Sequence, residues 1–506
     1  MFLGLDLGTS GLKGVLIDID GKVLATESDS LQVTSPYPLW SEQDPLSWWQ
    51  ALKSVVAKLH VNMAKQGLNL GSLQGIGLSG QMHGATFLDR QGKVLRPCIL
   101  WNDGRSFKQC EQLMQVYPEL LQRSGNLAMP GFTAPKVLWL KEYEPDTYKK
   151  VQYVLLPKDY LSYRLTDHFS TDCSDAAGTL WLNPETRQWD DELLKVCGLS
   201  QQNMPKVYEA CDVVATLSKA VALALDLPQV PVVAGAGDNA AGAVGMGIIN
   251  PEQGLLSLGT SGVYFSVSDK HKANPENTVH AFCHALPKRW HQMGVTLSGA
   301  NSLAWLAGIL NQPVADLLTR LSLWQAKQTT SFKTQVIFLP YLNGERTPYN
   351  DPQMRGQFIG LVNDTSPEEM TLAVLEGVAF SLLDCQNALK SAGSDAKDLS
   401  LIGGGARSPI WRQILANVLN KRLIYRDGGE VGPGLGAARL ALIGVQGLSQ
   451  LGGLDEIIQH ACHMPSILDS HEPDQDMRAY YLAKYALYQA YAKASLILNH
   501  ELAKLT

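Results

Sequence analysis

Short runs of apolar residues open the chain and alternate with turn signals. The runs MFLGLDL and GVLIDI flank the turn GTSGLK, and GKVLA follows the turn Asp20-Gly21, so the pattern predicts three strands joined by hairpins. Asp44 and Pro45 then supply an N-cap and a first-turn proline for SWWQALKSVVAKL, whose apolar residues recur at helical spacing. The chain therefore begins with a strand meander followed by a helix.

Two further strand-like segments end in loops rich in polar side chains. GIGLSG leads into GQMHG, and VLRPCIL leads into WNDGRS. Residues 230–249 predict a buried strand, a Gly-Asp turn and a helix of small residues that ends near Asn250-Pro251. We place the domain boundary there, which divides the chain into residues 1–246 and 247–506.

The second half begins in the same way as the first. The pentapeptide LGTSG of residues 7–11 returns at 258–262, again between two strand-like runs, which predicts an internal duplication. LSLIGGGARSPIWRQILANVL predicts a strand, a glycine turn and a helix capped by Ser408 with Pro409 at its first position. Residues 477–498 predict an amphipathic helix that packs on the second domain.

Composition and charge exclude several classes of function. At 506 residues and 45% apolar composition the chain can fill at least two cores. The formal net charge of −6 comes without a block of like charges, so we expect no nucleic-acid or membrane partner. The N-terminus lacks the basic region of a signal peptide, and the eight cysteines contain no CxxC pair. We expect a soluble cytoplasmic protein that binds small molecules.

The two LGTSG turns are candidate phosphate sites. Glycine lets the main chain approach a ligand, so backbone N–H groups and hydroxyls can gather around phosphate oxygens, although a plain hairpin turn is the alternative. Neither turn matches a Walker A loop or GxGxxG, and we expect a nucleotide held between two hairpins. The candidate ATP-binding residues of the two turns are Gly8, Thr9, Ser10, Gly259 and Thr260.

Charged residues flank the first turn, and a glycine run occurs in the second half. A carboxylate at Asp6 beside phosphates suggests Mg²⁺ held partly through water, unless Asp6 is only a turn residue. Lys13 offsets phosphate charge or is simply exposed. Gly404, Gly405 and Ser408 offer a flat surface and a helix N-terminus to a base or ribose, or form a tight turn without ligand.

Asp238 is the candidate general base, because an ionised carboxylate is what a kinase needs to accept a hydroxyl proton; a helix N-cap is the alternative. Asn239 is placed to orient a second hydroxyl. Donors, acceptors and an aromatic platform for a polyol come from Gln81, Met82, His83, Trp101, Asn102, Asp103 and Arg105. His280 and His284 lack the HExxH glutamate, and we assign no zinc to them. Lys158, Asp159, Asp172 and Asp175 either support the pocket or cap turns.

These segments together resemble a known family. DLGTSGLK, SLGTSG, AGAGDNAAGAVG and LIGGGARSPIWRQ, with residues 131–142 and 356–376, resemble the FGGY carbohydrate kinases across nearly the whole chain. The resemblance implies an α/β protein of two ribonuclease-H-like domains, as in the actin and hexokinase superfamily, with a cleft between them. It also implies ATP and Mg²⁺ as cofactors, and it makes a homodimer plausible.

The resemblance assigns roles to individual residues. It makes Asp238 the base, places Asp6 at the Mg²⁺–phosphate site and puts Met82 and His83 against the sugar. It places Thr9, Ser10, Gly259 and Thr260 on phosphates, and Gly404 and Gly405 beside the adenosine. Several relatives have an asparagine shortly after that glycine pair, where this chain departs from the pattern with Ser408-Pro409.

The implied reaction is transfer of the γ-phosphoryl group of Mg·ATP to the 5-hydroxyl of D-xylulose. Another small polyol, such as ribulose, fuculose or glycerol, is the nearest alternative. A nucleotide switch like actin or Hsp70 is the alternative of another class, since it uses the same double hairpins. Asp238 next to a polar pocket favours the kinase.

Overall fold

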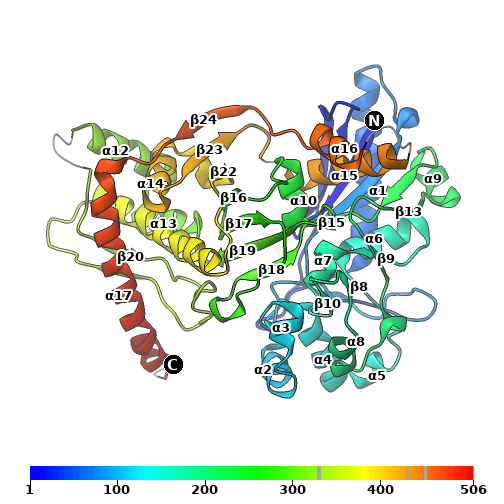
Figure 1. Ribbon diagram of the computed structural model, residues 1–506, viewed down its shortest axis with the longest axis horizontal. Coiled ribbons are helices and arrows are strands. Elements are labelled where there is room, and N and C mark those ends of the chain that lie inside the picture. The colour runs from blue at the N-terminus through cyan, green and yellow to red at the C-terminus, as the bar shows by residue number, and fades with distance from the viewer. Residues whose placement is uncertain (328–331, 430–431, 449–452, 505–506) are drawn as a thin grey trace.

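The computed structural model describes residues 1–327, 332–429, 432–448 and 453–504. Each half of the chain forms a mixed seven-stranded sheet with helices packed on it. The two halves lie side by side in Figure 1, with the blue and cyan half to the right and the yellow and red half to the left. The expectation of two α/β domains is confirmed.

The first sheet has the strand order β13-β14-β5-β1-β2-β3, with β15 also paired to β5. Its strands are β1 (Phe2–Leu7), β2 (Gly11–Ile17), β3 (Val23–Ser30), β5 (Gly75–Gly80), β13 (Val213–Thr216), β14 (Pro231–Val233) and β15 (Ala236–Gly237). β1, β2 and β3 form the expected antiparallel meander, and β5 joins β1 in parallel.

The second sheet has the order β18-β19-β17-β16-β22-β23-β24. Its strands are β16 (Gln253–Leu258), β17 (Gly262–Ser268), β18 (His280–Cys283), β19 (Trp290–Thr296), β22 (Asp398–Ile402), β23 (Arg422–Arg426) and β24 (Ile467–His471). The antiparallel run β16, β17, β19 matches β1, β2, β3, and β22 joins β16 in parallel as β5 joins β1. The predicted internal duplication is therefore present in the strand order, and each LGTSG turn closes the first hairpin of its sheet.

Helices cover both sheets. They are α1 (Pro45–Lys65), α2 (Phe107–Val116), α3 (Leu120–Ser124), α4 (Thr133–Tyr143), α5 (Pro145–Tyr148), α6 (Pro157–Thr166), α7 (Cys173–Ala177), α8 (Asp191–Val196), α9 (Lys219–Leu225), α10 (Asp238–Gly245), α11 (Asn301–Ile309), α12 (Val314–Lys327), α13 (Pro367–Ser391), α14 (Pro409–Leu419), α15 (Gly432–Leu448), α16 (Leu454–Ala461) and α17 (Arg478–Ala503). α1 begins after the predicted cap Asp44, and α14 begins after the predicted cap Ser408.

Short strands lie outside the two main sheets. They are β4 (Glu42–Gln43), β6 (Thr86–Leu88), β7 (Cys98–Ile99), β8 (Tyr153–Leu155), β9 (Ser170–Asp172), β10 (Leu182–Asn183), β11 (Gln188–Trp189), β12 (Lys206–Tyr208), β20 (Ile337–Leu339) and β21 (Gln357–Ile359). The expected strand VLRPCIL is thus reduced to β7, which pairs with β4 and not with the main sheet. Pro97 immediately before β7 has no N–H to donate to a ladder.

The alternation along β1 explains how the first sheet is covered. Leu3, Leu5 and Leu7 pack in a cluster with α1, whereas Phe2 packs in a cluster with residues of α15. Gly4 also faces α15, since a Cβ built on it would lie 2.0 Å from the Gly434 carbonyl oxygen. Successive residues of a strand point to opposite faces, so one strand of small and apolar residues serves both layers.

α15 follows β23 in the sequence and packs on the first sheet and on α10. The two helices touch through glycines: a Cβ on Gly436 would lie 1.8 Å from the Ala241 carbonyl oxygen, and one on Gly245 would lie 2.0 Å from that of Gly432. Packing against α15 therefore fixes the position of α10, whose first residue is Asp238. The proposed boundary between residues 246 and 247 stays a prediction.

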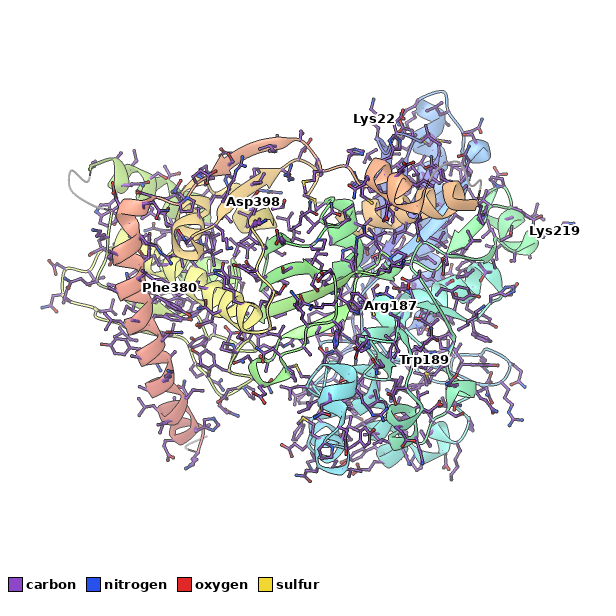
Figure 2. The ribbon with its side chains drawn as sticks, viewed as in Figure 1. Lys22, Arg187, Trp189, Lys219, Phe380 and Asp398 are labelled. Carbon is purple, nitrogen blue, oxygen red and sulfur yellow. The ribbon has the colours of Figure 1, made fainter. Side chains whose placement is uncertain are left out.

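α13 is the central helix of the second half. Among the described residues it is the one helix long and apolar enough to cross a membrane, and 94% of that apolar stretch is buried inside the protein. Phe380, labelled in Figure 2, lies on this helix and packs with its ring 5.3 Å from that of Tyr488 on α17. As predicted, the C-terminal helix packs on the second domain, against α13, α14 and β20.

Arg187 joins the two halves where they meet (Figure 2). Its guanidinium donates hydrogen bonds to the carbonyl oxygens of Arg289, at 3.0 Å, and of His284, at 3.3 Å. It also forms an ion pair with Glu209 at 2.6 Å. The junction is thus held by polar contacts as well as by the α10–α15 crossing.

Candidate functional site

A cavity of about 210 Å³ is lined by both halves of the chain. From the first half it takes Met82, His83, Trp101, Met129, Gly131, Phe132, Asp238 and Asn239, and from the second Ser261, Val263, His280, Phe282, Met293, Val295 and Arg346. The turn residue Ser261 and the carboxylate of Asp238 border the same space. A ligand in this cavity therefore touches the candidate base and the second phosphate turn together.

Asp238 is the first residue of α10, and the cap position belongs to Gly237. Its Oδ1 accepts hydrogen bonds from the backbone N–H of Asn239 at 2.7 Å and from the Asn239 side chain at 3.0 Å. Burial, and then the negative charge of Asp6, raise the pKa of Asp238 to about 7. A carboxyl with this pKa can accept a proton at neutral pH and later release it.

Asp6 lies near the end of β1, opposite Lys13 on β2 and Ser79 on β5. Ser79 Oγ donates a hydrogen bond to Asp6 Oδ1 at 3.1 Å. Burial raises the pKa of Asp6 to about 6, while the Ser79 hydroxyl and the charge of Lys13 lower it. Two half-buried carboxyls, Asp6 and Asp238, thus interact beside the first glycine turn, an arrangement that a divalent cation would stabilise.

The two LGTSG turns occupy the same place in their sheets but are closed by different hydrogen bonds. In the first, the Gly8 N–H donates to the Gly11 carbonyl oxygen at 2.9 Å, and in the second the Gly259 N–H donates to that of Ser261 at 3.1 Å. The second turn is further held by the N–H of Ala300, which donates to the Gly259 carbonyl oxygen at 2.7 Å. Each turn follows directly on the strand that lies at the centre of its sheet.

His83 presents a lone pair to a ligand. Its Nδ1 lies 2.7 Å from the Gly178 carbonyl oxygen, which can only accept, so Nδ1 carries the proton and Nε2 is the acceptor. Burial lowers the pKa of His83 to about 3, and the imidazole is neutral. The residue has a φ of 69°, a left-handed conformation that costs free energy and is held by its surroundings.

Residues of α4 hold the His83 loop in place. Lys136 Nζ donates to the carbonyl oxygens of His83 at 2.8 Å and of Gly131 at 2.7 Å, and Thr133 Oγ1 donates to that of His83 at 3.1 Å. Burial lowers the pKa of Lys136 to about 7. The segment 131–142 therefore lines the cavity with Gly131 and Phe132 and holds the backbone of His83 through Thr133 and Lys136.

Four predicted sugar contacts, Gln81, Asn102, Asp103 and Arg105, do not line the cavity, which takes in Met82, His83, Trp101 and Asn239 of the predicted set. Gln81 is buried; it accepts a hydrogen bond from Thr9 Oγ1 at 3.0 Å, and Thr9 Oγ1 in turn accepts one from Trp101 Nε1 at 2.9 Å. Asp103 is bound at 2.6 Å by its ion pair with Arg105, and Asn102 is exposed. Gln81 and Asp103 thus position the first turn and the Trp101 loop.

A second cavity, of about 540 Å³, lies beside the glycine run of the second half. It is lined by Gly404, Gly405 and Ser408, by Arg407 and by apolar residues of α11 and α12 such as Leu303 and Leu318. Gly403 has a φ of 94° and stands against Leu258, the last residue of β16. The apolar wall and the glycine surface have the character of a site for a planar base.

Gly404 offers a test of this cavity, because a Cβ built on it would meet no atom within 4 Å. We expect Gly404→Leu to fill part of the space and raise the KM for ATP roughly tenfold, the effect of losing about 1.4 kcal/mol of binding, while the KM for the sugar stays within twofold. Steady-state kinetics with each substrate varied measures both. Gly308→Leu on α11, also free of contacts within 4 Å, is the matched control; equal effects of the two variants on ATP would contradict the assignment.

The sequence left two roles open for Lys158, Asp159, Asp172 and Asp175, which were support of the pocket and capping of turns. These four residues form one buried cluster. Lys158 Nζ lies 2.6 Å from Asp159, 2.9 Å from Asp172 and 3.7 Å from Asp175. Asp172 also caps α7 through Ser174, and Ser174 Oγ accepts a hydrogen bond from the Gly237 N–H at 3.2 Å. The cluster therefore both caps a helix and holds the residue that precedes Asp238.

Sequence reasoning missed most of the second half's contribution to the cavity. His280 lines it from β18, with its ring stacked on Phe282 at 5.7 Å, whereas His284 lies 3.2 Å from the Ile248 carbonyl oxygen. Arg346 also lines the cavity from the second half, and Phe132 lines it from the first. The alternation in HAFC, which places its first and third residues on one face of the strand, was a signal for His280 and Phe282. No sequence signal pointed to Arg346.

Comparison with known proteins agrees over nearly the whole chain. The model of the N-terminal domain of the FGGY family of carbohydrate kinases matches residues 1–245, and that of the C-terminal domain matches 254–445. The chain is 47% identical to the xylulose kinase of Escherichia coli over 97% of its own length and 96% of that protein, and 46% identical to that of Klebsiella pneumoniae over 95% and 96%. A crystal structure described as a xyloylose kinase from Brucella ovis superposes with a TM-score of 0.92 at 42% identity, covering 98% of this chain and 99% of that one.

Proposed function

Because this chain belongs to the FGGY family of carbohydrate kinases, we propose that it transfers the γ-phosphoryl group of ATP to the 5-hydroxyl of D-xylulose, giving D-xylulose 5-phosphate and ADP. It is an ATP-dependent phosphotransferase, as its family implies. The observation that carries the proposal is the position of Asp238, a half-buried carboxyl with a pKa raised to about 7 in a cavity lined by both halves. The two xylulose kinases that match nearly the full length support the choice of sugar.

The residues around the cavity have separate roles in the phosphoryl transfer. Asp238 accepts the proton of the attacking hydroxyl as its oxygen bonds to the γ-phosphorus and the bond from that phosphorus to the β-phosphate oxygen breaks. The N–H groups and hydroxyls of the two LGTSG turns receive the phosphate oxygens. His83 Nε2 accepts a hydrogen bond from a sugar hydroxyl, and Trp101 forms an apolar wall.

The donor set beside the first turn fits Mg²⁺. This ion is bound in kinases by one or two carboxylates together with water and substrate phosphates, and the half-buried Asp6, with its pKa raised to about 6, supplies such a carboxylate. When bound, Mg²⁺ would neutralise charge on the phosphates. Ser79 and Lys13 keep Asp6 oriented and ionised.

The raised pKa of Asp238 predicts an acid limb in the pH profile. Below about pH 7 the carboxyl is protonated and cannot accept the hydroxyl proton, so activity is lost as the pH falls and is retained above that value. We expect kcat/KM, measured with both substrates below saturation, to fall about tenfold per pH unit below pH 7. An acid limb near pH 4, the ordinary range of an aspartate, would contradict the role of burial and of Asp6.

The proposal is tested by coupled measurement of ADP release. Mg·ATP is offered with D-xylulose, ribulose, fuculose, glycerol or gluconate, and without sugar. We expect kcat/KM for D-xylulose to exceed that for each other acceptor at least tenfold. A preference for another polyol would correct the substrate, and a slow release indifferent to every sugar would support the nucleotide switch.

We propose the cytoplasm as the compartment. All eight cysteines are free and buried, which suits a reducing environment. The substrates, ATP and a small sugar, are available there.

A further inference from the structure

Arg346 contributes a cationic side chain to the sugar cavity from the second half of the chain. It is half-buried, and within the described part of the chain its guanidinium makes no hydrogen bond or ion pair. A guanidinium has five N–H donors, and leaving them unsatisfied in a partly buried place costs free energy. Such a group in a binding cavity has the character of a ligand contact.

The carboxyl whose charge acts on Arg346 is that of Glu345, and it is already engaged. Glu345 Oε1 accepts hydrogen bonds from the N–H of Leu297 at 2.9 Å and of Arg346 at 2.8 Å, and its Oε2 accepts one from Thr296 Oγ1 at 2.6 Å. Glu345 thus holds the backbone of Arg346 against β19. The Arg346 carbonyl oxygen is held too, since it accepts a hydrogen bond from Thr278 Oγ1 at 2.9 Å.

Different charges act on the titratable residues of the cavity. The charge of Arg346, after the larger effect of burial, lowers the pKa of both His83 and His280, so the guanidinium lies on the histidine side. The charge that acts on Asp238, again after burial, is that of Asp6 on the phosphate side. Phe132 separates the two histidines, with its ring 4.6 Å from His83 and 5.6 Å from His280.

We propose that Arg346 is a specificity-determining residue whose guanidinium donates hydrogen bonds to the oxygen atoms on C1 and C2 of the ketose. The inference rests on the proposed function. With the 5-hydroxyl at Asp238, the opposite end of a five-carbon chain reaches the histidine side. A carbonyl oxygen only accepts hydrogen bonds, so it needs the donor that Arg346 supplies, whereas His83 Nε2 accepts from a hydroxyl.

The same contact couples the sugar to both halves of the protein. Asp238 belongs to α10 of the first half, and Arg346 follows β20 of the second. A ketose bound to both side chains bridges the halves, whereas a shorter acceptor or one without the carbonyl makes a weaker bridge. Selectivity for a ketose is thus built from the half of the chain that does not contain Asp238.

The test compares Arg346→Gln and Arg346→Lys with wild type, using D-xylulose and xylitol, in which a hydroxyl replaces the C2 carbonyl. For Arg346→Gln we expect the KM for D-xylulose to rise at least tenfold, the KM for Mg·ATP to stay within twofold, and the ratio of kcat/KM for D-xylulose over xylitol to fall toward one. Arg346→Lys, which keeps a positively charged donor group, should have a KM for D-xylulose and a sugar ratio between those of wild type and Arg346→Gln. Arg355→Gln, an exposed arginine of the same segment, is the control expected to match wild type.

Two outcomes would overturn the inference. If both Arg346 variants kept the wild-type KM and sugar ratio, the residue would not contact the acceptor. If the KM for ATP rose in step with that for the sugar, Arg346 would act on phosphates. Thermal unfolding of each variant distinguishes loss of the fold from loss of a sugar contact. If Arg346→Gln does not fold, Arg346→Lys still provides the test. A wild-type enzyme without response to D-xylulose would defeat the proposed function itself and is seen before any variant is made.

Discussion

Asp238→Asn is expected to lower kcat for phosphoryl transfer by roughly 10²–10⁴-fold, the usual contribution of a general base. The amide keeps the size of the carboxyl but cannot accept the proton of the attacking hydroxyl. Because the change leaves the cavity walls in place, the Kd values for ATP and for the sugar, measured by calorimetry, should stay within about threefold. The acid limb of the residual activity near pH 7 should also disappear.

A matched substitution separates this effect from any general consequence of losing an aspartate at a helix start. Asp191 is likewise the first residue of a helix, α8, and lies outside the cavity. Asp191→Asn should keep kcat within twofold. If Asp238→Asn retained more than a tenth of the wild-type kcat, another group would have to accept the proton.

Gly436→Ala is expected to destabilise the protein and impair catalysis although residue 436 lies outside the cavity. The added Cβ would lie 1.8 Å from the Ala241 carbonyl oxygen, so α10 and α15 would have to move apart. Overpacking against a flexible side chain costs about 1–3 kcal/mol, and here the obstacle is backbone, so we expect the upper end or more. A cost of about 3 kcal/mol lowers the unfolding midpoint of a domain of this size by roughly 6–12 °C.

The catalytic loss follows from the position of Asp238 at the start of α10. A shift of that helix by 1 Å can cost about a hundredfold in rate, because the base must meet the hydroxyl at hydrogen-bond distance. Gly447→Ala on the same helix is the control, since a Cβ there meets no atom within 4 Å; it should leave activity unchanged and raise stability slightly. Calorimetry and steady-state kinetics measure both variants. If Gly436→Ala and Gly447→Ala had equal unfolding midpoints, α10 and α15 could move apart without loss of stability, which would contradict the prediction.

The capped helices were predictable because their signals are local. Asp44 and Ser408 each precede a proline and a helix, and a cap satisfies N–H groups within one turn, so neighbouring residues suffice to specify it. The duplicated meander was predictable for a similar reason, since each hairpin is closed by its own LGTSG turn. The strand around β7 was not, because pairing with β4 depends on a distant segment.

The candidate site was predictable where a residue type carries its chemistry in a recognisable turn. Asp238 and Asp6 stand beside glycine turns, and both were placed from sequence; their roles stay predictions. Gln81 and Asp103 sit in equally polar loops, yet their side chains turn to Thr9 and Arg105 and not to the cavity. Side-chain direction within a loop depends on packing, which the order of residues does not reveal.

The amino-acid sequence by itself determined the strand meanders, the phosphate turns, the helix caps and the membership of the family, because each of these is written in short segments or in their repetition. Only the tertiary structure decided which side chains share a cavity. It brought Arg346 and His280 to the pocket that holds Asp238, and it set α15 against the first sheet through glycines that let the two backbones approach closely. Arg346 lies 108 residues after Asp238, and α15 lies still farther from β1 in the sequence. Such contacts are fixed by the packing of whole layers and not by local preference.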